Sequence, residues 1–174
     1  IVHGVPDKRR LRDGDILTVD CGALHQGWIA DSAWTFTVGV VSDEAAALLD
    51  ATEKALYASI ECARAGKRTG DVAAIMQAEV EGRGYNVIRR HTSHGIGRSL
   101  HEDPQILNHG RAGTGPLLRE GMTIALEPMV LAGHPDTKLL DDGWTVAALD
   151  GELTAHFEHT IAVTEGEAEI LTKL

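Results

Sequence analysis

One local pattern occurs twice in this chain, and it limits the fold more than any other feature of the sequence. A glycine preceded by an acidic residue opens a β-prone run that ends on a carboxylate six positions later. The first copy runs from Gly14 to Asp20 (GDILTVD) and the second from Gly121 to Glu127 (GMTIALE). The repeat predicts that the two runs form equivalent strands in two related halves.

The segments that follow Asp31 in the first half and Glu158 in the second half match as well. Asp31 precedes Gly39 by eight positions through DSAWTFTVG, and Glu158 precedes Gly166 by eight through EHTIAVTEG. Only the connections differ: the paired acids stand 11 positions apart in the first half and 31 apart in the second, where residues 133–150 are predicted to form an inserted excursion. The pattern therefore predicts a pseudo-twofold arrangement in which each half supplies two carboxylates to one shared centre.

The first pair of acids is predicted to lie on one face of a β-hairpin. With its turn centred between His25 and Gln26, Asp20 stands directly opposite Asp31. Cβ atoms of opposed residues lie about 4.5–5.5 Å apart, and like charges at that distance destabilise a sheet unless a cation binds between them. One isolated pair is equally compatible with two solvated residues at strand ends. Because Glu127 and Glu158 form a second, matching pair, a metal site is favoured over two solvated strand ends.

Between the two halves the sequence predicts two helices, to which no catalytic or binding role is assigned. Ser42 is a good N-cap for a helix over Ala45–Ala65 that stops at Gly66. Thr69 opens a second helix that ends by Gly82. Both helices are expected to cover the sheet.

Length, charge and cysteine usage narrow the class of protein. At 174 residues and 43% hydrophobic content the chain can bury one sizeable core, which predicts a single domain. A formal net charge of −10 argues against nucleic acid or an anionic membrane as the main partner. Cys21 and Cys62 have no zinc or redox spacing, which indicates reduced thiols in a cytoplasmic protein. Because the chain begins at Ile1 in mid-pattern, it is expected to be a piece of a longer polypeptide.

Six motifs also occur in a fixed order along nearly the whole chain. They are His3–Asp7, Gly14–Asp20, His94–Pro104, Gly121–Met129, Asp142–Val146 and Glu158–Ile161. Together they resemble the type I methionine aminopeptidases of peptidase family M24. The resemblance implies an α+β pita-bread (creatinase/aminopeptidase-like) fold, in which two pseudo-symmetric halves form a curved antiparallel sheet covered by helices. It also implies that residues 1–174 are a single metallopeptidase catalytic domain without its N-terminal segment.

The resemblance assigns a two-metal site to five residues of this chain. Asp31 and Glu158 would bridge the two ions, His94 and Glu127 would hold the first, and Asp20 would hold the second. An oxygen-rich set with one imidazole suits Mn²⁺, Fe²⁺, Co²⁺ or Zn²⁺, and the absence of thiolates from it argues against a structural zinc site. Two such ions lower the pKa of a bridging water and polarise the scissile carbonyl.

Further roles follow from the same resemblance. Glu127 is expected to act as the general base, with His101 or His3 donating a hydrogen bond to the developing charge. His3 and His101 would contact the substrate, and Trp144 and Leu100 would line its pocket. Leu100 stands where bacterial relatives commonly have an aromatic residue. The remaining histidines are interpreted as surface or core residues without a role.

The implied activity is removal of N-terminal methionine from nascent proteins and peptides, at the ribosome, by a cytoplasmic monomer that contacts neither nucleic acid nor membrane. Prolidases and X-Pro aminopeptidases share the fold and all five ligands, so they remain an alternative. A pita-bread module that only binds peptides is disfavoured because no ligand position is lost. A two-metal phosphoesterase would usually need more histidines or basic residues near the ligands.

Overall fold

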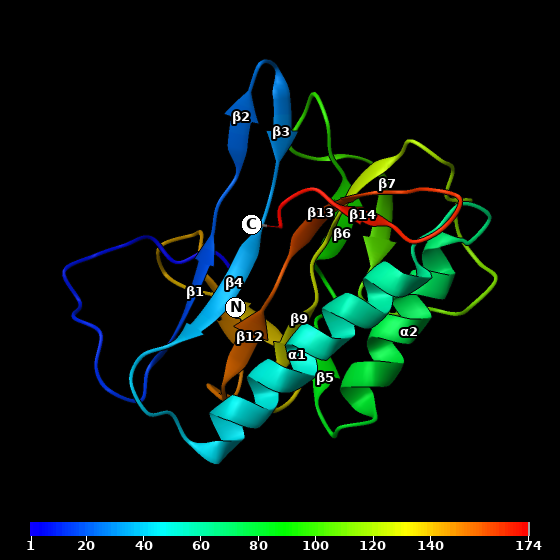
Figure 1. Ribbon diagram of the computed structural model, residues 1–174. Coiled ribbons are helices and arrows are strands. Elements are labelled where there is room, and N and C mark those ends of the chain that lie inside the picture. The colour runs from blue at the N-terminus through cyan, green and yellow to red at the C-terminus, as the bar shows by residue number, and fades with distance from the viewer. Residues whose placement is uncertain (174) are drawn as a thin grey trace.

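The computed structural model describes residues 1–173, and the chain opens with a hairpin of four short strands. The outer pair, β1 with β4, and the inner pair, β2 with β3, are both antiparallel. Figure 1 shows the β2–β3 tip projecting beyond the rest of the hairpin. The strands are β1 (Ile16–Asp20), β2 (Ala23–His25), β3 (Trp28–Ala30) and β4 (Ala33–Thr37).

The observed register shows that the predicted opposition of the two acids was wrong. The turn is centred between Gln26 and Gly27, whose φ angles are 50° and 80°, as a two-residue type I′ turn requires. Asp20 consequently pairs with Ala33 and not with Asp31. The sequence did not reveal this turn because a glutamine rarely adopts positive φ. The shift of two residues keeps both acids on one face, since strand side chains alternate with a period of two.

Two helices follow at the predicted places. α1 (Asp43–Cys62) begins after Ser42, whose Oγ accepts a hydrogen bond from the Ala45 N–H at 3.1 Å. α2 (Thr69–Glu81) is capped by the Asp71 carboxylate, which accepts from the backbone N–H of the residue before the helix at 2.8 Å. α1 ends three residues earlier than predicted. Figure 1 shows the two helices side by side across one face of the main sheet.

The main sheet has five strands in the order β14-β13-β8-β6-β7. Its central strand β8 pairs with β13 so that Leu126 stands opposite His159. One step beyond this pair, at the end of the ladder, stand Glu127 and Glu158, while β6 brings His94 opposite Ala125 of β8. The strands are β6 (Thr92–Gly95), β7 (Glu102–Leu107), β8 (Thr123–Leu126), β13 (His159–Ala162) and β14 (Glu169–Ile170).

The segment between Glu127 and Glu158 forms two further small sheets, one of them together with β5. One has the order β12-β9-β5, and the other is the β10–β11 hairpin. This hairpin lies within residues 133–150, so the predicted excursion is confirmed. The strands are β5 (Asn86–Val87), β9 (Met129–Leu131), β10 (Thr137–Leu139), β11 (Val146–Ala148) and β12 (Thr154–His156).

The main apolar core lies between the two helices and the sheets they cover. Its largest fully buried side chains include Leu48 and Leu56 of α1, Met76 of α2 and Ile124 of β8. This packing fixes the sheet edges that carry the acids and His94. Within residues 1–173 no helix is long and apolar enough to cross a membrane.

Candidate metal centre

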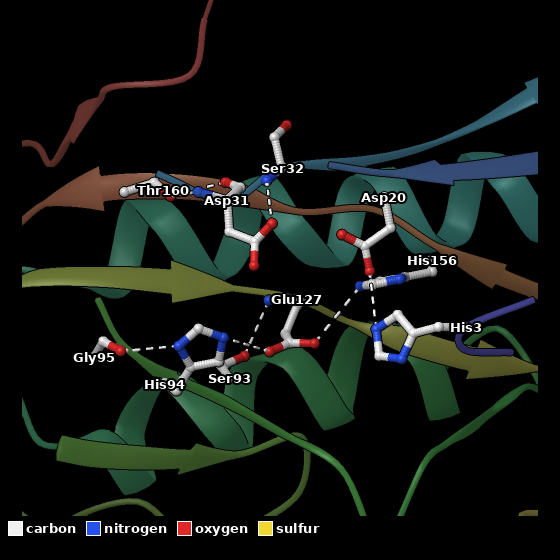
Figure 2. A network of polar contacts seen from close by, with 10 residues as sticks. All are labelled: His3, Asp20, Asp31, Ser32, Ser93, His94, Gly95, Glu127, His156 and Thr160. Atoms are coloured by element: carbon white, nitrogen blue, oxygen red, sulfur yellow. Dashed lines mark hydrogen bonds and ion pairs between the residues drawn. The ribbon is translucent and has the colours of Figure 1, made fainter. Parts of the chain in front are cut away.

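Side chains from several separate segments line a cleft of about 210 Å³ where the first hairpin meets the main sheet. Each of the five ligands predicted from the sequence contributes to its wall, and so do both of the predicted substrate-contacting histidines. Figure 2 shows the polar network around this point. The predicted residues that line the cleft are His3, Asp20, Asp31, His94, His101, Glu127 and Glu158.

Three of these residues form a tight buried group. Asp31, His94 and Glu158 each offer one ligand atom, and these atoms all lie within 4.8 Å of one another. The Nδ1 atom of His94 lies 2.8 Å from the carbonyl oxygen of Gly95, which can only accept a hydrogen bond. Nδ1 therefore carries the proton, and burial lowers the pKa of His94, so the ring is neutral near pH 7. Its Nε2 lone pair is left free for a cation.

Glu127 lies between two imidazoles. Its Oε1 is 3.3 Å from Nε2 of His94, and its Oε2 is 3.7 Å from Nε2 of His156 (Figure 2). The Ser93 hydroxyl accepts a hydrogen bond from the Glu127 backbone N–H at 2.9 Å and fixes the end of the strand. Because Nε2 of His94 and an ionised Oε1 are both acceptors, their proximity requires a proton or a cation between them.

Asp20 stands slightly apart from the tight group. Its Oδ2 lies 3.1 Å from Nε2 of His3, an exposed histidine near the start of the chain. Burial and the neighbouring Asp31 carboxylate raise the pKa of Asp20, while the contact with His3 opposes that rise. The structure thus places Asp20 in the same cleft but outside the cluster formed by Asp31, His94 and Glu158.

The electrostatics of the cleft are unfavourable for its acids. Burial first, and then the charges of Glu127, Asp31 and Asp20, raise the pKa of Glu158 to about 10. Burial, followed by Asp20 and Asp31, also raises the pKa of Glu127 well above its ordinary value. Buried carboxylates this close together need protons or cations to offset their repulsion. The donor set, four carboxylates and one neutral imidazole with a free lone pair, fits divalent metal ions.

Hydroxyl groups hold the acid-bearing backbone of the two halves together. The Thr160 Oγ1 accepts from the Asp31 N–H at 2.8 Å and donates to the Asp31 carbonyl at 2.7 Å. The Ser32 hydroxyl donates to the Glu158 carbonyl, and the Glu158 N–H donates to the Ala33 carbonyl. These bonds fix the position of Asp31 relative to Glu158 without using either carboxylate.

The predicted substrate-contacting residues differ in where they lie. The His101 ring packs edge-on against His94, with 4.4 Å between ring centroids. Trp144 is 60% exposed and lies 6.0 Å from the His3 ring, whereas Leu100 lies against Gly22 of the first hairpin. Neither Trp144 nor Leu100 is among the residues that line the cleft.

Two histidines near the site were assigned no role from the sequence. His91 lines the cleft, and its buried Nδ1 has no hydrogen-bond partner among residues 1–173. His156 lies behind Glu127 and is almost completely buried. A signal for His156 existed, because it stands two positions before Glu158 and strand alternation places such residues on one face. We find no comparable sequence signal for His91.

Comparison with known proteins identifies the family. The sequence profile of metallopeptidase family M24 matches residues 1–165. Methionine aminopeptidase 1 of Bacillus subtilis is 47% identical over 174 residues, which are all of this chain and 70% of that protein. The methionine aminopeptidase of Clostridium perfringens is 46% identical over 99% of this chain and 69% of its own length. The chain thus spans about 70% of these relatives.

Solved structures agree with this assignment. The methionine aminopeptidase from Rickettsia prowazekii superposes with a TM-score of 0.96 at 43% identity, covering 98% of this chain and 69% of that one. The enzyme from Thermotoga maritima gives 0.92 at 48% identity, covering 94% and 66%. Prolidase from Pyrococcus furiosus gives 0.79 at 25% identity, covering 99% and 45%. The fold is the pita-bread fold, the chain is built to use divalent metal, and it belongs to metallopeptidase family M24.

Proposed function

We propose that residues 1–174 form a single methionine aminopeptidase catalytic domain, which removes N-terminal methionine from peptides and nascent proteins. The observation that carries this proposal is the convergence of four carboxylates and one neutral imidazole on a single cleft, in a chain 47% identical to a methionine aminopeptidase. Identity to the prolidases is lower, at 25% for the Pyrococcus furiosus enzyme. The methionine enzymes are therefore favoured over the X-Pro branch of the family.

Five residues would hold two ions of Mn²⁺, Fe²⁺, Co²⁺ or Zn²⁺. His94 and Glu127 are assigned to one ion because their Nε2 and Oε1 atoms lie 3.3 Å apart. Asp20 is assigned to the other ion because it stands outside the tight group, and Asp31 and Glu158 are assigned to both. Bound ions would polarise the scissile carbonyl and lower the pKa of the attacking water.

The side chains of the cleft supply proton transfer and charge stabilisation. The carboxylate of Glu127 lines the cleft, where it can accept a proton from the attacking water and return it to the leaving amine. The exposed ring of His101 beside His94 can donate a hydrogen bond to the oxygen on which charge develops. His3 is placed to do the same from the side of Asp20. Glu127 is therefore the proposed general base.

Substrate recognition begins with the free α-amine. A free α-amine would bind at the ion that Asp20 is assigned to hold, which explains cleavage at the N-terminus rather than within a peptide. Trp144, 6.0 Å from the His3 ring, and Leu100, beside Gly22, remain the proposed walls for the methionine side chain. Under the same proposal, the enzyme is a cytoplasmic monomer that acts on nascent chains at the ribosome. It binds neither nucleic acid nor membrane directly.

A dipeptide panel tests the function. Met-Ala, Met-Gly, norleucine-Ala, Leu-Ala and Gly-Pro are incubated with the protein after addition of Mn²⁺ or Co²⁺, with parallel samples in excess chelator. We expect metal-dependent cleavage of Met-Ala and Met-Gly. Norleucine-Ala and Leu-Ala should be cleaved more slowly, because one altered contact in an apolar pocket is worth about 1–3 kcal/mol.

Two outcomes would contradict the proposal. Preference for Gly-Pro over Met-Ala would move the protein to the prolidase branch while leaving the metal site intact. Binding of Met-Ala without hydrolysis, in protein shown by elemental analysis to hold its metal, would support a non-catalytic binding module.

A further inference from the structure

His156 is a buried polar side chain that the mechanism proposed above does not use. It is 1% exposed, and neither ring nitrogen has a hydrogen-bond partner among residues 1–173. Buried polar atoms in folded proteins are almost always hydrogen-bonded, because leaving one unpaired carries a desolvation cost. A leucine of similar size would avoid this cost. An imidazole at this position therefore calls for a functional explanation.

The candidate hydrogen-bond partner for the His156 ring is the carboxylate of Glu127. Nε2 of His156 lies 3.7 Å from Oε2 of Glu127, while the other oxygen, Oε1, lies 3.3 Å from Nε2 of His94. Figure 2 shows the carboxylate between the two rings. His156 is not among the residues that line the cleft, so it stands behind Glu127 and cannot touch a substrate bound in front of it.

The backbone that carries the His156 ring is held firmly. The Thr35 hydroxyl donates to the His156 carbonyl at 2.7 Å and accepts from the His156 N–H at 3.0 Å. The Thr18 hydroxyl of β1, 2.8 Å from that of Thr35 in β4, extends this bridge across the first hairpin. β12 is also paired with β9, where His156 stands opposite Met129. The backbone of β12 that carries the ring is therefore rigid, and it joins both halves of the fold.

The carboxylate is the more adjustable partner. A hydrogen bond between nitrogen and oxygen spans about 2.7–3.2 Å, so the observed 3.7 Å contact is slightly too long. The last side-chain torsion of a glutamate has a broad energy minimum, so rotation of the Glu127 carboxylate to shorten this contact would cost little energy. A ring fixed in position therefore sets the plane that this carboxylate adopts.

We propose that His156 is a positioning residue for Glu127, donating a hydrogen bond from Nε2–H to Oε2 so that Oε1 is presented towards His94. The inference rests on the proposed role of Glu127 as metal ligand and general base. It assigns the proton of the neutral imidazole to Nε2 and leaves Nδ1 without a partner. One hydrogen bond thus determines which carboxylate oxygen faces the metal and which faces away from it.

A purely structural role for His156 leads to different expectations. A residue that only fills space would be replaced by leucine with little effect on turnover. Removing an unpaired buried polar ring would also leave the melting temperature unchanged or raise it. If His156 positions Glu127, its replacement by leucine should leave the protein equally stable but impair catalysis. Turnover, measured in a variant whose melting temperature shows that it is folded, therefore separates the two roles.

The test compares His156→Leu with His156→Gln in the metal-loaded protein. Loss of a group that orients a metal ligand typically costs about 10–100-fold, so kcat for Met-Ala should fall by that factor in His156→Leu, with a smaller change in KM. The amide of His156→Gln keeps an N–H donor and should recover most of the loss. His156→Asn, whose amide is too short to reach Oε2, replaces the leucine variant if that variant does not fold.

His159→Leu is the matched control. This buried ring bonds to Thr172 and packs against Trp34, away from Glu127, so its loss should lower the melting temperature and leave kcat unchanged. Wild-type kcat in a folded His156→Leu, or a glutamine variant no better than leucine, overturns the inference.

A second readout does not depend on turnover. Chelator-treated proteins are titrated with Co²⁺ alone and followed by visible absorbance. We expect His156→Leu to bind the first ion about 10-fold more weakly, with an altered spectrum, whereas His159→Leu matches wild type. If the wild-type chain cleaves no dipeptide, the proposed function fails, and this titration alone decides the role of His156. Identical titrations of wild type and His156→Leu would then overturn it.

Discussion

At the scale of single residues, the features that make Glu127 costly to ionise also suit it to proton transfer. Burial and two neighbouring acids raise its pKa well above the ordinary value, so it holds a proton more readily than an exposed glutamate does. A general base works best when its pKa lies near the working pH. A bound cation would bring the pKa back down towards that range, since an opposite charge favours the ionised form.

Glu127→Gln tests this role directly. The amide keeps the shape of the side chain and one oxygen that can bind a metal, but it cannot accept a proton. We expect kcat for Met-Ala to fall by about 100-fold or more, with a smaller change in KM. Steady-state kinetics should be paired with elemental analysis of the same sample. Glu165→Gln, which alters an exposed loop carboxylate, is the control. Near-normal kcat in a fully metallated Glu127→Gln would exclude Glu127 as the base.

At the scale of elements, the two halves are joined at the site by hydroxyl groups, and Thr160 makes the most direct link. Its Oγ1 satisfies both the N–H and the carbonyl of Asp31 inside the protein. Thr160→Val keeps the volume and leaves both backbone groups without this partner. We expect a loss of about 2–4 kcal/mol in the free energy of unfolding, measured by urea denaturation, together with weaker metal binding.

Thr164 offers a control with the same chemistry at the surface. Its hydroxyl also accepts from a backbone N–H, that of Gly166, and donates to a carbonyl, that of Glu167. Water can replace both bonds there, so Thr164→Val should cost less than about 1 kcal/mol. Equal losses in the two variants would show that the link to Asp31 contributes nothing beyond an ordinary surface bond.

Elements with local signals were predictable from the sequence, whereas register was not. The cap at Ser42 and the glycine repeats at Gly14 and Gly121 act within a few residues, so the helices and the acid-bearing strands follow from them. The hairpin register depended on Gln26 adopting a left-handed conformation that glutamine rarely shows. Strand alternation places His156 on the same face as Glu158, but its contact with Glu127, which is distant in the sequence, is not reported by any local pattern.

At the scale of the whole molecule, the acid cluster makes the stability of the fold depend on bound cations. Dialysis against a strong chelator should lower the melting temperature relative to protein in excess Mn²⁺ or Co²⁺. Ligand at about 100 times its dissociation constant stabilises the folded state by ~2.7 kcal/mol. For a domain of this size that corresponds to about 5–10 °C. Equal melting temperatures in calorimetry would argue against metal binding to the folded state.

The direction of the pH dependence follows from the shifted groups. Glu158 has an ordinary pKa of 4.5 and a folded pKa of about 10, so the stability it contributes is complete below pH 4.5 and is lost as pH rises towards 10. Burial lowers the pKa of His156 from 6.5 to about 3, so its contribution is present above pH 6.5 and is lost as pH falls towards 3. The two trends oppose each other between pH 4.5 and 6.5. Above pH 6.5 the loss from Glu158 stands without opposition from His156.

We therefore predict that the melting temperature of the metal-free protein falls steadily between pH 6.5 and 9. In excess Mn²⁺ it should fall much less, because ligand carboxylates are ionised when they hold a cation and binding releases their protons. Melts at matched ionic strength, with and without chelator, measure both slopes. Glu158→Gln removes the titrating group, so its metal-free decline should be shallower than that of wild type. A metal-free melting temperature that rises from pH 6.5 to 9 would mean that Glu158 is already ionised in the folded protein without a cation.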